Sequence, residues 1–220
     1  MHFVDDGLDG ERRALLAAAL PHVPWDGWSA RTLKTAAKEV GIDDGLAAIA
    51  FPEGGRDLLH FWSQELDIKM IEALEARDLA PLKVRQRVTL AVHVRIELMS
   101  RHREAVRRAS AFLILPHNAG LAAKLLYGTV NAIWHGIGDR STDWNFYSKR
   151  ALLAAVFSST VLFWLGDDSE NAESTWAFLD RRIEDVMSIE KGKARWRAWT
   201  ENLPSPFSLL DDLFDARRAD

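Results

Sequence analysis

The spacing of apolar residues constrains the fold of this chain more than any other feature. Along the 220 residues, apolar side chains recur at intervals of three and four, the period of one face of a helix. No long run alternates apolar with polar residues, and no Asn-Gly or Asp-Gly pair separates two β-branched runs, so hairpins have no support. The sequence therefore predicts an all-α chain of roughly nine or more helices.

Proline, glycine and N-capping residues mark where each expected helix begins and ends. Pro21 and Pro24 stop the first helix, and Ser29 is a suitable N-cap for the next, with Gly41 as its stop. Asp43 or Asp44 caps a short third helix, which Pro52 ends. The expected helices cover about 11–20, 30–40, 44–51, 55–76, 81–99, 102–115, 119–137, 143–165, 170–188, 193–201 and 208–217. The first three are short with tight turns and the later ones suit a bundle, which predicts an N-terminal unit (1–54), a helical bundle (55–190) and an amphipathic tail (191–220).

Composition excludes several classes of protein. The chain has no cysteine, so disulfides and thiolate sites are absent, and 28 basic against 32 acidic residues argue against a strongly basic nucleic-acid binder. The first ten residues carry three aspartates and lack the pattern of a signal or transit peptide, so we expect a cytoplasmic protein. The longest uncharged apolar run, Ala151–Gly166, is too short to suggest a membrane span and predicts a buried helix.

The spacing from Ala14 to Trp62 resembles the N-terminal helix-turn-helix domain of the TetR family of repressors. Such a domain reads DNA with its second motif helix, here residues 43–50, which offers no Arg, Lys, Asn, Gln or Tyr to a base edge. Residues 29–55 hold three basic and four acidic side chains, although phosphate neutralisation dominates DNA affinity. We favour an inherited scaffold that binds no nucleic acid; a ligand-responsive TetR-type transcriptional regulator is the alternative.

A second group of motifs is more specific. Residues 138–150 (Gly-Asp-Arg-Ser-Thr-Asp-Trp-Asn-Phe-Tyr-Ser-Lys-Arg) resemble the signature of the coenzyme-Q biosynthesis protein nine family, a lipid-binding accessory factor of ubiquinone synthesis. Residues 102–108, 132–134 and 175–186 also fit that family in the same order. The resemblance covers about Leu15–Glu190.

This resemblance implies a TetR-like fold, a homodimer, and a C-terminal domain whose core holds an isoprenoid quinone precursor or other lipid. It also implies a surface that docks the di-iron hydroxylase of late ubiquinone synthesis. The residues themselves predict no cofactor. By motif match the docking residues are Asp143, Asn145, Phe146, Tyr147 and Arg150. Independently of the family, Asp143, Tyr147 and Arg150 share a helix face, and Tyr and Arg are frequent interface hot spots. A capped helix with internal ion pairs is the alternative.

The expected lipid wall consists of apolar residues on the inward faces of the long helices. Its members are Trp62, Leu66, Met70, Val92, Ile96, Phe112, Leu126, Val130, Ile133, Trp134, Val156 and Trp164. Ordinary core packing explains any single one of them better than lipid contact does. Residues 83–108 hold eight basic side chains against two acidic ones and form a basic stripe, which suits anionic headgroups, an acidic partner or a solvated face.

The tail contains two amphipathic segments, and the first presents Trp196 and Trp199 among basic residues. This pattern is typical of an interfacial helix, so we expect peripheral contact with the inner membrane through these two side chains. A helix packed on its own domain is the alternative.

Catalytic and metal-binding motifs are missing from the sequence. The pairs Asp57/His60 and His93/Glu97 lack an obvious third ligand and favour surface hydrogen bonds over a metal site. No nucleophile elbow, P-loop or dinucleotide fingerprint occurs. The sequence therefore favours a non-enzymatic accessory protein; an enzyme acting on isoprenoid lipids is a weaker alternative.

Overall fold

The computed structural model describes residues 7–138 and 145–201, and every regular element in these ranges is a helix. The all-α prediction is confirmed. The chain divides into two compact units, Met1–Asp180 and Arg181–Asp220, which are described separately. The expected boundary at residues 54 and 55 lies inside the first unit.

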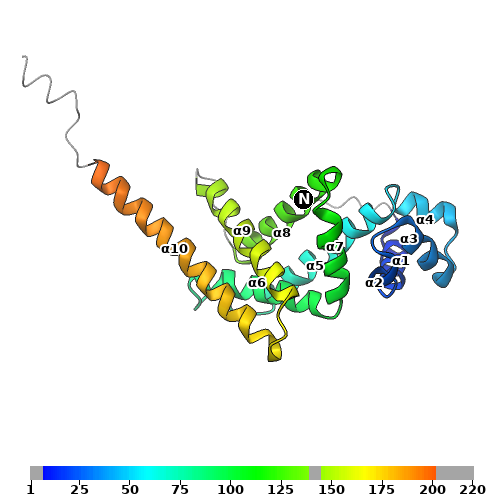
Figure 1. Ribbon diagram of the computed structural model, residues 1–220, viewed down its shortest axis with the longest axis horizontal. Helices are drawn as coiled ribbons and strands as arrows, with labels where there is room; N and C mark the ends of the chain where they lie inside the picture. The colour runs from blue at the N-terminus through cyan, green and yellow to red at the C-terminus, as the bar shows by residue number, and fades with distance from the viewer. Residues whose placement is uncertain (1–6, 139–144, 202–220) are drawn as a thin grey trace, which may run out of the picture. The chain divides into compact units, whose positions relative to one another are not determined.

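The helices follow one another with short connections (Figure 1). In chain order they are α1 (Asp9–Ala19), α2 (Val23–Asp26), α3 (Ala30–Val40), α4 (Asp44–Ala50), α5 (Gly55–Glu75), α6 (Val84–Ser100), α7 (Arg103–Leu113), the 3₁₀ turn η1 (Pro116–Asn118), α8 (Ala119–Gly136), α9 (Asn145–Leu165), the 3₁₀ turn η2 (Glu170–Ala172) and α10 (Glu173–Glu201). Figure 1 shows α1–α4 grouped at one end of α5, with α6–α9 packed along the rest of this first unit.

The caps of α3 and α4 set the helix-turn-helix of the N-terminal group. Ser29 accepts a hydrogen bond from the Thr32 backbone N–H at 3.2 Å, and Asp43 accepts one from the Gly45 N–H at 2.8 Å. Gly41 ends α3 in the left-handed region, at φ 69°. Both expected helices are present because each has its predicted N-cap and stop.

Three details of the helices differ from the expected ones. The first helix ends before Pro21 as expected, but the short helix α2 was not expected; Pro24 lies in its first turn, where a missing N–H costs nothing. Helix α6 begins at Val84 rather than Pro81. The two expected segments 170–188 and 193–201 are one helix, α10, because Gly192 costs only about 1 kcal/mol in a helix interior.

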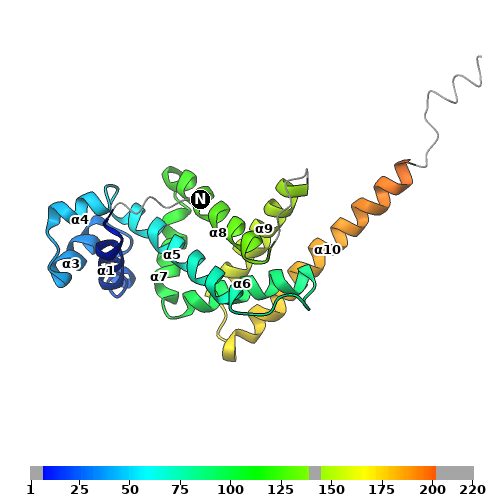
Figure 2. The ribbon, with the colours of Figure 1, turned by 180° about the vertical axis from the view of Figure 1, so that it is seen from behind.

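The bundle is built around α5, which packs against α6 and α8, while α9 packs against α7 and α8 (Figure 2). A Cβ on Gly136 would lie 3.0 Å from Leu74 Cδ1, so this glycine permits close approach of α8 to α5. Within α9, the window Ser148–Leu165 is long and apolar enough for a membrane span, with a mean hydropathy of 1.2. Of this window 39% is buried, including Leu153, Val156 and Trp164, whereas Leu162 is exposed, so the predicted buried helix is found only in part.

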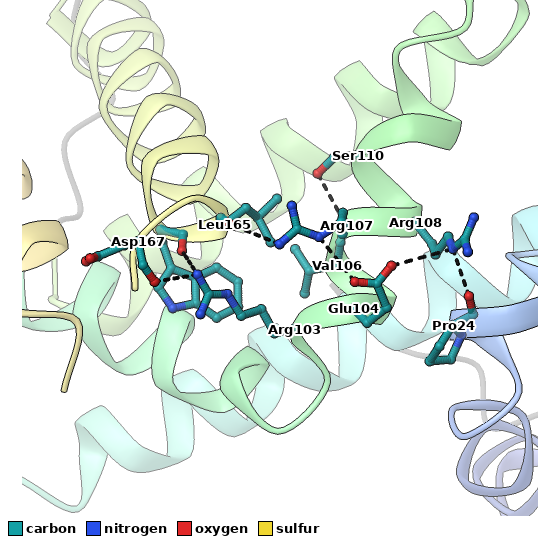
Figure 3. Close-up of polar contacts among 10 residues, drawn as sticks. Pro24, Arg103, Glu104, Val106, Arg107, Arg108, Ser110, Leu165 and Asp167 are labelled. Carbon is teal, nitrogen blue, oxygen red and sulfur yellow. Dashed lines mark hydrogen bonds and ion pairs between the residues drawn. The ribbon is translucent and has the colours of Figure 1, made fainter. Parts of the chain in front are cut away.

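Arginines of α7 bind backbone carbonyl groups of neighbouring elements (Figure 3). Arg103 Nη2 donates to the carbonyl oxygens of Trp164 at 2.7 Å and Asp167 at 2.5 Å, and Arg107 Nη2 donates to Leu165 O at 2.8 Å. Cations at these carbonyls satisfy the acceptors left open at the end of α9. Arg108 Nε donates to Pro24 O at 2.9 Å and so joins α7 to the N-terminal group. Much of the expected basic stripe is therefore committed to holding the fold.

Asp167 fixes the entry into α10. Its carboxylate accepts hydrogen bonds from the Ser169 N–H at 2.9 Å, the Thr175 N–H at 2.8 Å and the Thr175 hydroxyl at 2.6 Å. The hydrogen bonds from Ser169 and Thr175 hold the pKa of Asp167 well below its ordinary value.

Replacing Asp167 with asparagine is expected to lower the melting temperature at pH 7. A carboxyl whose folded pKa is depressed stabilises the fold above its unfolded pKa, and this stabilisation is lost as the pH falls. The difference between the wild type and Asp167→Asn should therefore be full at pH 7 and narrow below about pH 4. Thermal melts by circular dichroism measure it, and Asp168→Asn, at an exposed neighbour, is the control. A difference independent of pH would contradict the assignment.

Candidate functional site

An apolar pocket of about 270 Å³, open to the surface, lies between the helices of the bundle in the first unit and is called the bundle pocket below. It is lined by Leu59, Trp62, Ser63, Leu66, Arg95, Met99, Val106, Ala109, Ser110, Leu113, Ala122, Leu125, Leu126, Thr129, Phe157, Ser158, Val161 and Leu162, which come from all five helices α5–α9. Thirteen of these eighteen side chains are apolar. A concave apolar cavity with few polar groups is typical of a small-molecule site.

Three of the twelve expected lipid-wall residues line the bundle pocket: Trp62, Leu66 and Leu126. Phe112 is half-buried and is not among the residues lining the pocket. The other eight are buried elsewhere in the core and are Met70, Val92, Ile96, Val130, Ile133, Trp134, Val156 and Trp164. Contact of these nine residues with a lipid stays a prediction.

None of the pocket residues on α7 and α9 was expected from the sequence. On α7 the residues Val106, Ala109, Ser110 and Leu113 recur at three and four, a helix-face pattern that could have identified them. Their neighbour Ala122 on α8 is one of the small side chains that leave the space open. Gly136, further along α8, packs against Leu74 and leaves no such space.

A buried ion pair lies on the α5–α6–α8 side of the bundle pocket. Arg95 Nε donates to Asp67 Oδ1 at 2.8 Å, and Arg95 Nη2 lies 3.4 Å from both the backbone O and the Oγ of Ser63. Thr129 Oγ1 donates to Asp67 Oδ2 at 3.2 Å. The side chains of Arg95 and Asp67 are only 4% and 13% exposed, so the pair is largely removed from water. Burial raises the pKa of Asp67, an effect that the Arg95 charge opposes.

A second, more polar cavity of about 680 Å³ adjoins the N-terminal group and is called the N-terminal cleft. Residues of α1, α5 and α6 line it together with Arg77, Arg101 and His102. Trp62 and Leu66 line both cavities and therefore form the partition between them. Trp28 supports this partition: its ring centroid lies 5.1 Å from that of Trp62, and its indole N–H donates to Ala105 O at 3.1 Å.

The expected docking residues fall around the start of α9. Asp143 lies outside the described residues, whereas Asn145, Phe146 and Tyr147 form the first turn of α9. Arg150 is buried, and its Nη2 donates to Asn131 Oδ1 of α8 at 3.0 Å. This hydrogen bond joins the beginning of α9 to α8, so Arg150 helps to place the turn that holds the other three residues.

The expected membrane contacts lie on α10, and the ligand-like pair His93/Glu97 lies on α6. Trp196 and Trp199 belong to the part of α10 in the second unit. His93 Nδ1 lies 3.3 Å from Glu97 Oε1, and its ring stacks on Trp176. Across residues 7–138 and 145–201, no group of three or more His, Cys, Asp or Glu is arranged to hold a metal ion.

Sequence comparisons relate this chain to proteins of ubiquinone biosynthesis. Residues 119–190 match the family model COQ9. "Ubiquinone biosynthesis protein COQ9, mitochondrial" of Homo sapiens is 34% identical over 184 residues, covering 80% of this chain and 57% of the relative. The Drosophila melanogaster protein of the same name is 28% identical over 205 residues, covering 91% of this chain and 63% of the relative. The chain thus spans about three fifths of the length of these relatives.

A solved structure supports the fold. The TetR transcriptional regulator from Nitrosomonas europaea matches with a TM-score of 0.65 at 20% identity, covering 80% of this chain and 97% of that chain. At 20% identity this similarity shows a TetR-like fold only and does not imply DNA binding. The predicted TetR-like architecture is confirmed.

Proposed function

The chain belongs to the COQ9 family through residues 119–190, and on that premise we propose that it is a non-enzymatic accessory protein that binds an isoprenoid quinone precursor in the bundle pocket. It presents this lipid to the membrane-associated di-iron hydroxylase of ubiquinone biosynthesis. The observation that carries the proposal is the pocket itself, whose eighteen lining residues include thirteen apolar ones. A prenylated ring gains most of its binding free energy from apolar burial, which this lining supplies.

The surface charges of the helix-turn-helix favour this function over transcriptional regulation. Arg31 pairs with Asp26 at 3.4 Å and Lys34 pairs with Asp44 at 3.7 Å, so two of the three cations in residues 29–55 lie beside carboxylates of the same unit. DNA affinity depends on cations that neutralise phosphates, and Asp44 stands at the start of α4. We propose that this domain serves as a scaffold and binds no nucleic acid.

Delivery requires a partner surface and access to the bilayer. We assign the partner surface to the start of α9 and its preceding motif, through Asp143, Asn145, Phe146 and Tyr147. The buried Arg150 supports this surface by its hydrogen bond to Asn131 of α8. Trp196 and Trp199 contact the membrane peripherally, and the protein acts as a homodimer on the inner membrane. The combination of interfacial tryptophans with basic neighbours supports the membrane contact.

Native mass spectrometry of the full chain tests lipid binding. The protein, expressed in a host that makes ubiquinone, should carry an added mass that organic extraction releases as a prenylated aromatic compound. Repeated recovery of empty protein from such cells would contradict the proposal. A gel shift with upstream DNA, reversed by salt, would favour the regulator instead.

Replacing Tyr147 with alanine is expected to weaken binding to the hydroxylase by roughly 30-fold, the effect of losing an interface hot spot worth about 2 kcal/mol. Surface plasmon resonance with the purified hydroxylase measures the affinity, and quinone output in a complemented deletion strain should fall with it. The chain offers a matched control in Tyr127→Ala, because Tyr127 is its only other tyrosine and is 54% exposed on α8. Equal affinity of Tyr147→Ala and the wild type would remove the docking assignment.

A further inference from the structure

The N-terminal cleft combines an apolar wall with an excess of positive charge. Eight of its fifteen lining residues are apolar, including Leu16 of α1, Leu66 of α5 and Leu98 of α6. Its charged residues, four basic and two acidic in a chain of net charge −4, are Arg13, Glu65, Lys69, Arg77, Glu97 and Arg101. The volume of about 680 Å³ lies within the range of about 300–1,000 Å³ that is usual for small-molecule sites.

Both carboxylates of the N-terminal cleft lie beside a basic side chain. Arg13 Nε is 3.3 Å from Glu65 Oε2, and His93 Nδ1 is 3.3 Å from Glu97 Oε1. The cations that remain form no ion pair with either carboxylate. Their charge is therefore available to an anion that enters the cleft.

Two of these cations lie around His102, and the three residues are called the cationic group. Lys69 of α5 and Arg101 at the end of α6 are exposed, and neither side chain makes a hydrogen bond or ion pair with any residue that the structure describes. Burial lowers the pKa of His102, and the charges of Arg101 and Lys69 lower it further, so both cations are within electrostatic reach of its ring. The His102 ring meets Trp62 edge-on, with 6.4 Å between ring centroids, which places the group at the apolar wall.

We propose that the N-terminal cleft binds an amphipathic organic acid, whose carboxylate or phosphate lies against the cationic group and whose apolar chain lies along α1, α5 and α6. An ammonium, a guanidinium and an imidazole N–H are donors that suit such an anion. An inorganic ion alone would leave the eight apolar residues of the wall in water. The site is separate from the bundle pocket and does not rest on the proposed function, because a neutral prenylated ring gains little from these cations.

Calorimetric titration of the full chain tests the need for an anionic head. The probes are dodecanoate, dodecyl phosphate and dodecanol, which share one chain length, each used below the concentration at which it forms micelles. Lys69→Gln/Arg101→Gln removes the two exposed cations. Lys38→Gln/Lys124→Gln is the matched control, because it lowers the net charge equally at two exposed positions that line neither cavity.

Lys69→Gln/Arg101→Gln should bind both anions about 10- to 100-fold more weakly than the wild type and bind dodecanol unchanged. The control variant should bind all three probes as the wild type does. Equal affinity of Lys69→Gln/Arg101→Gln and the wild type for the anions would overturn the proposal. So would wild-type binding of dodecanol as tight as that of dodecanoate, or no binding of either anion. These outcomes leave the bundle pocket and its quinone precursor untouched.

The pKa of His102 locates the bound anion. A negative charge beside the ring favours its charged form, so saturating dodecanoate should raise this pKa in a proton NMR titration. The signal is assigned by its loss in His102→Gln. His60 is the control, because burial also lowers its pKa and it lines neither cavity. Saturation with dodecanoate that leaves the pKa of His102 unchanged would place the acid elsewhere and overturn the site.

Discussion

Replacing Arg95 alone with alanine is expected to lower the free energy of unfolding by about 3–5 kcal/mol. The substitution leaves Asp67 buried, with a side chain only 13% exposed and Thr129 as its remaining side-chain partner. A carboxylate in this position must either keep an uncompensated charge or take up a proton, and both cost free energy. Urea unfolding followed by circular dichroism measures the loss.

Two variants distinguish the effect of leaving Asp67 buried without its cation from the effect of removing any arginine. The double variant Arg95→Met/Asp67→Leu removes both partners. Its urea midpoint of unfolding should equal or exceed that of the wild type, since replacing a buried pair with apolar groups is often neutral or stabilising. Arg101→Ala removes an exposed arginine at the end of α6 and should change stability by less than about 0.5 kcal/mol. If Arg95→Ala is no less stable than Arg101→Ala, the pair does not hold α5 and α6 together.

The parts of the fold that were predictable from sequence depend on short-range chemistry. Ser29 and Asp43 cap the helices they were expected to cap, and Gly41 ends α3 with a positive φ. These helix caps and stops act within a few residues, so residue types and spacing are sufficient to recognise them. The unexpected helix α2 and the continuity of α10 show that Pro24 and Gly192 lie at positions where a helix tolerates them.

The bundle pocket was less predictable because it depends on which helices meet. Trp62, Leu66 and Leu126 were identified, yet most other expected wall residues are core, since an inward-facing apolar residue looks the same in sequence whether it faces a neighbour or a cavity. Arg95 was counted as part of a basic stripe. Only its distance of 2.8 Å from Asp67, 28 residues away, distinguishes it from an exposed cation.

The arginines of residues 83–108 show the same dependence on tertiary contacts. Their number suggested a charged surface, but Arg103 and Arg107 complete the end of α9 and Arg108 reaches α2. By binding these carbonyl groups, Arg103 and Arg107 help to position α7 and α9, two of the five helices that line the bundle pocket. The motif that carries the family resemblance at residues 102–108 therefore helps to build the bundle pocket.

Filling the bundle pocket is expected to have the largest effect on lipid binding. Ala122 lies on α8 and lines the pocket, so Ala122→Phe places a ring in the space that the ligand needs. Native mass spectrometry should then find at least about tenfold less bound lipid, because a pocket of this size cannot hold both groups. Stability should change little or rise, since the new ring enters an existing cavity rather than close-packed core.

The adjacent residue supplies the control for this substitution. Ala123 follows Ala122 on the same helix but is exposed and is not among the residues lining the bundle pocket, so Ala123→Phe adds the same ring to the outside. Lipid content should be preserved in Ala123→Phe and lost in Ala122→Phe, with both proteins folded by circular dichroism. Undiminished lipid in Ala122→Phe would place the ligand elsewhere, and the N-terminal cleft behind Trp62 would be the next site to block. Loss in both variants would point to a general effect on α8, because only the inward ring competes with a ligand for the same volume.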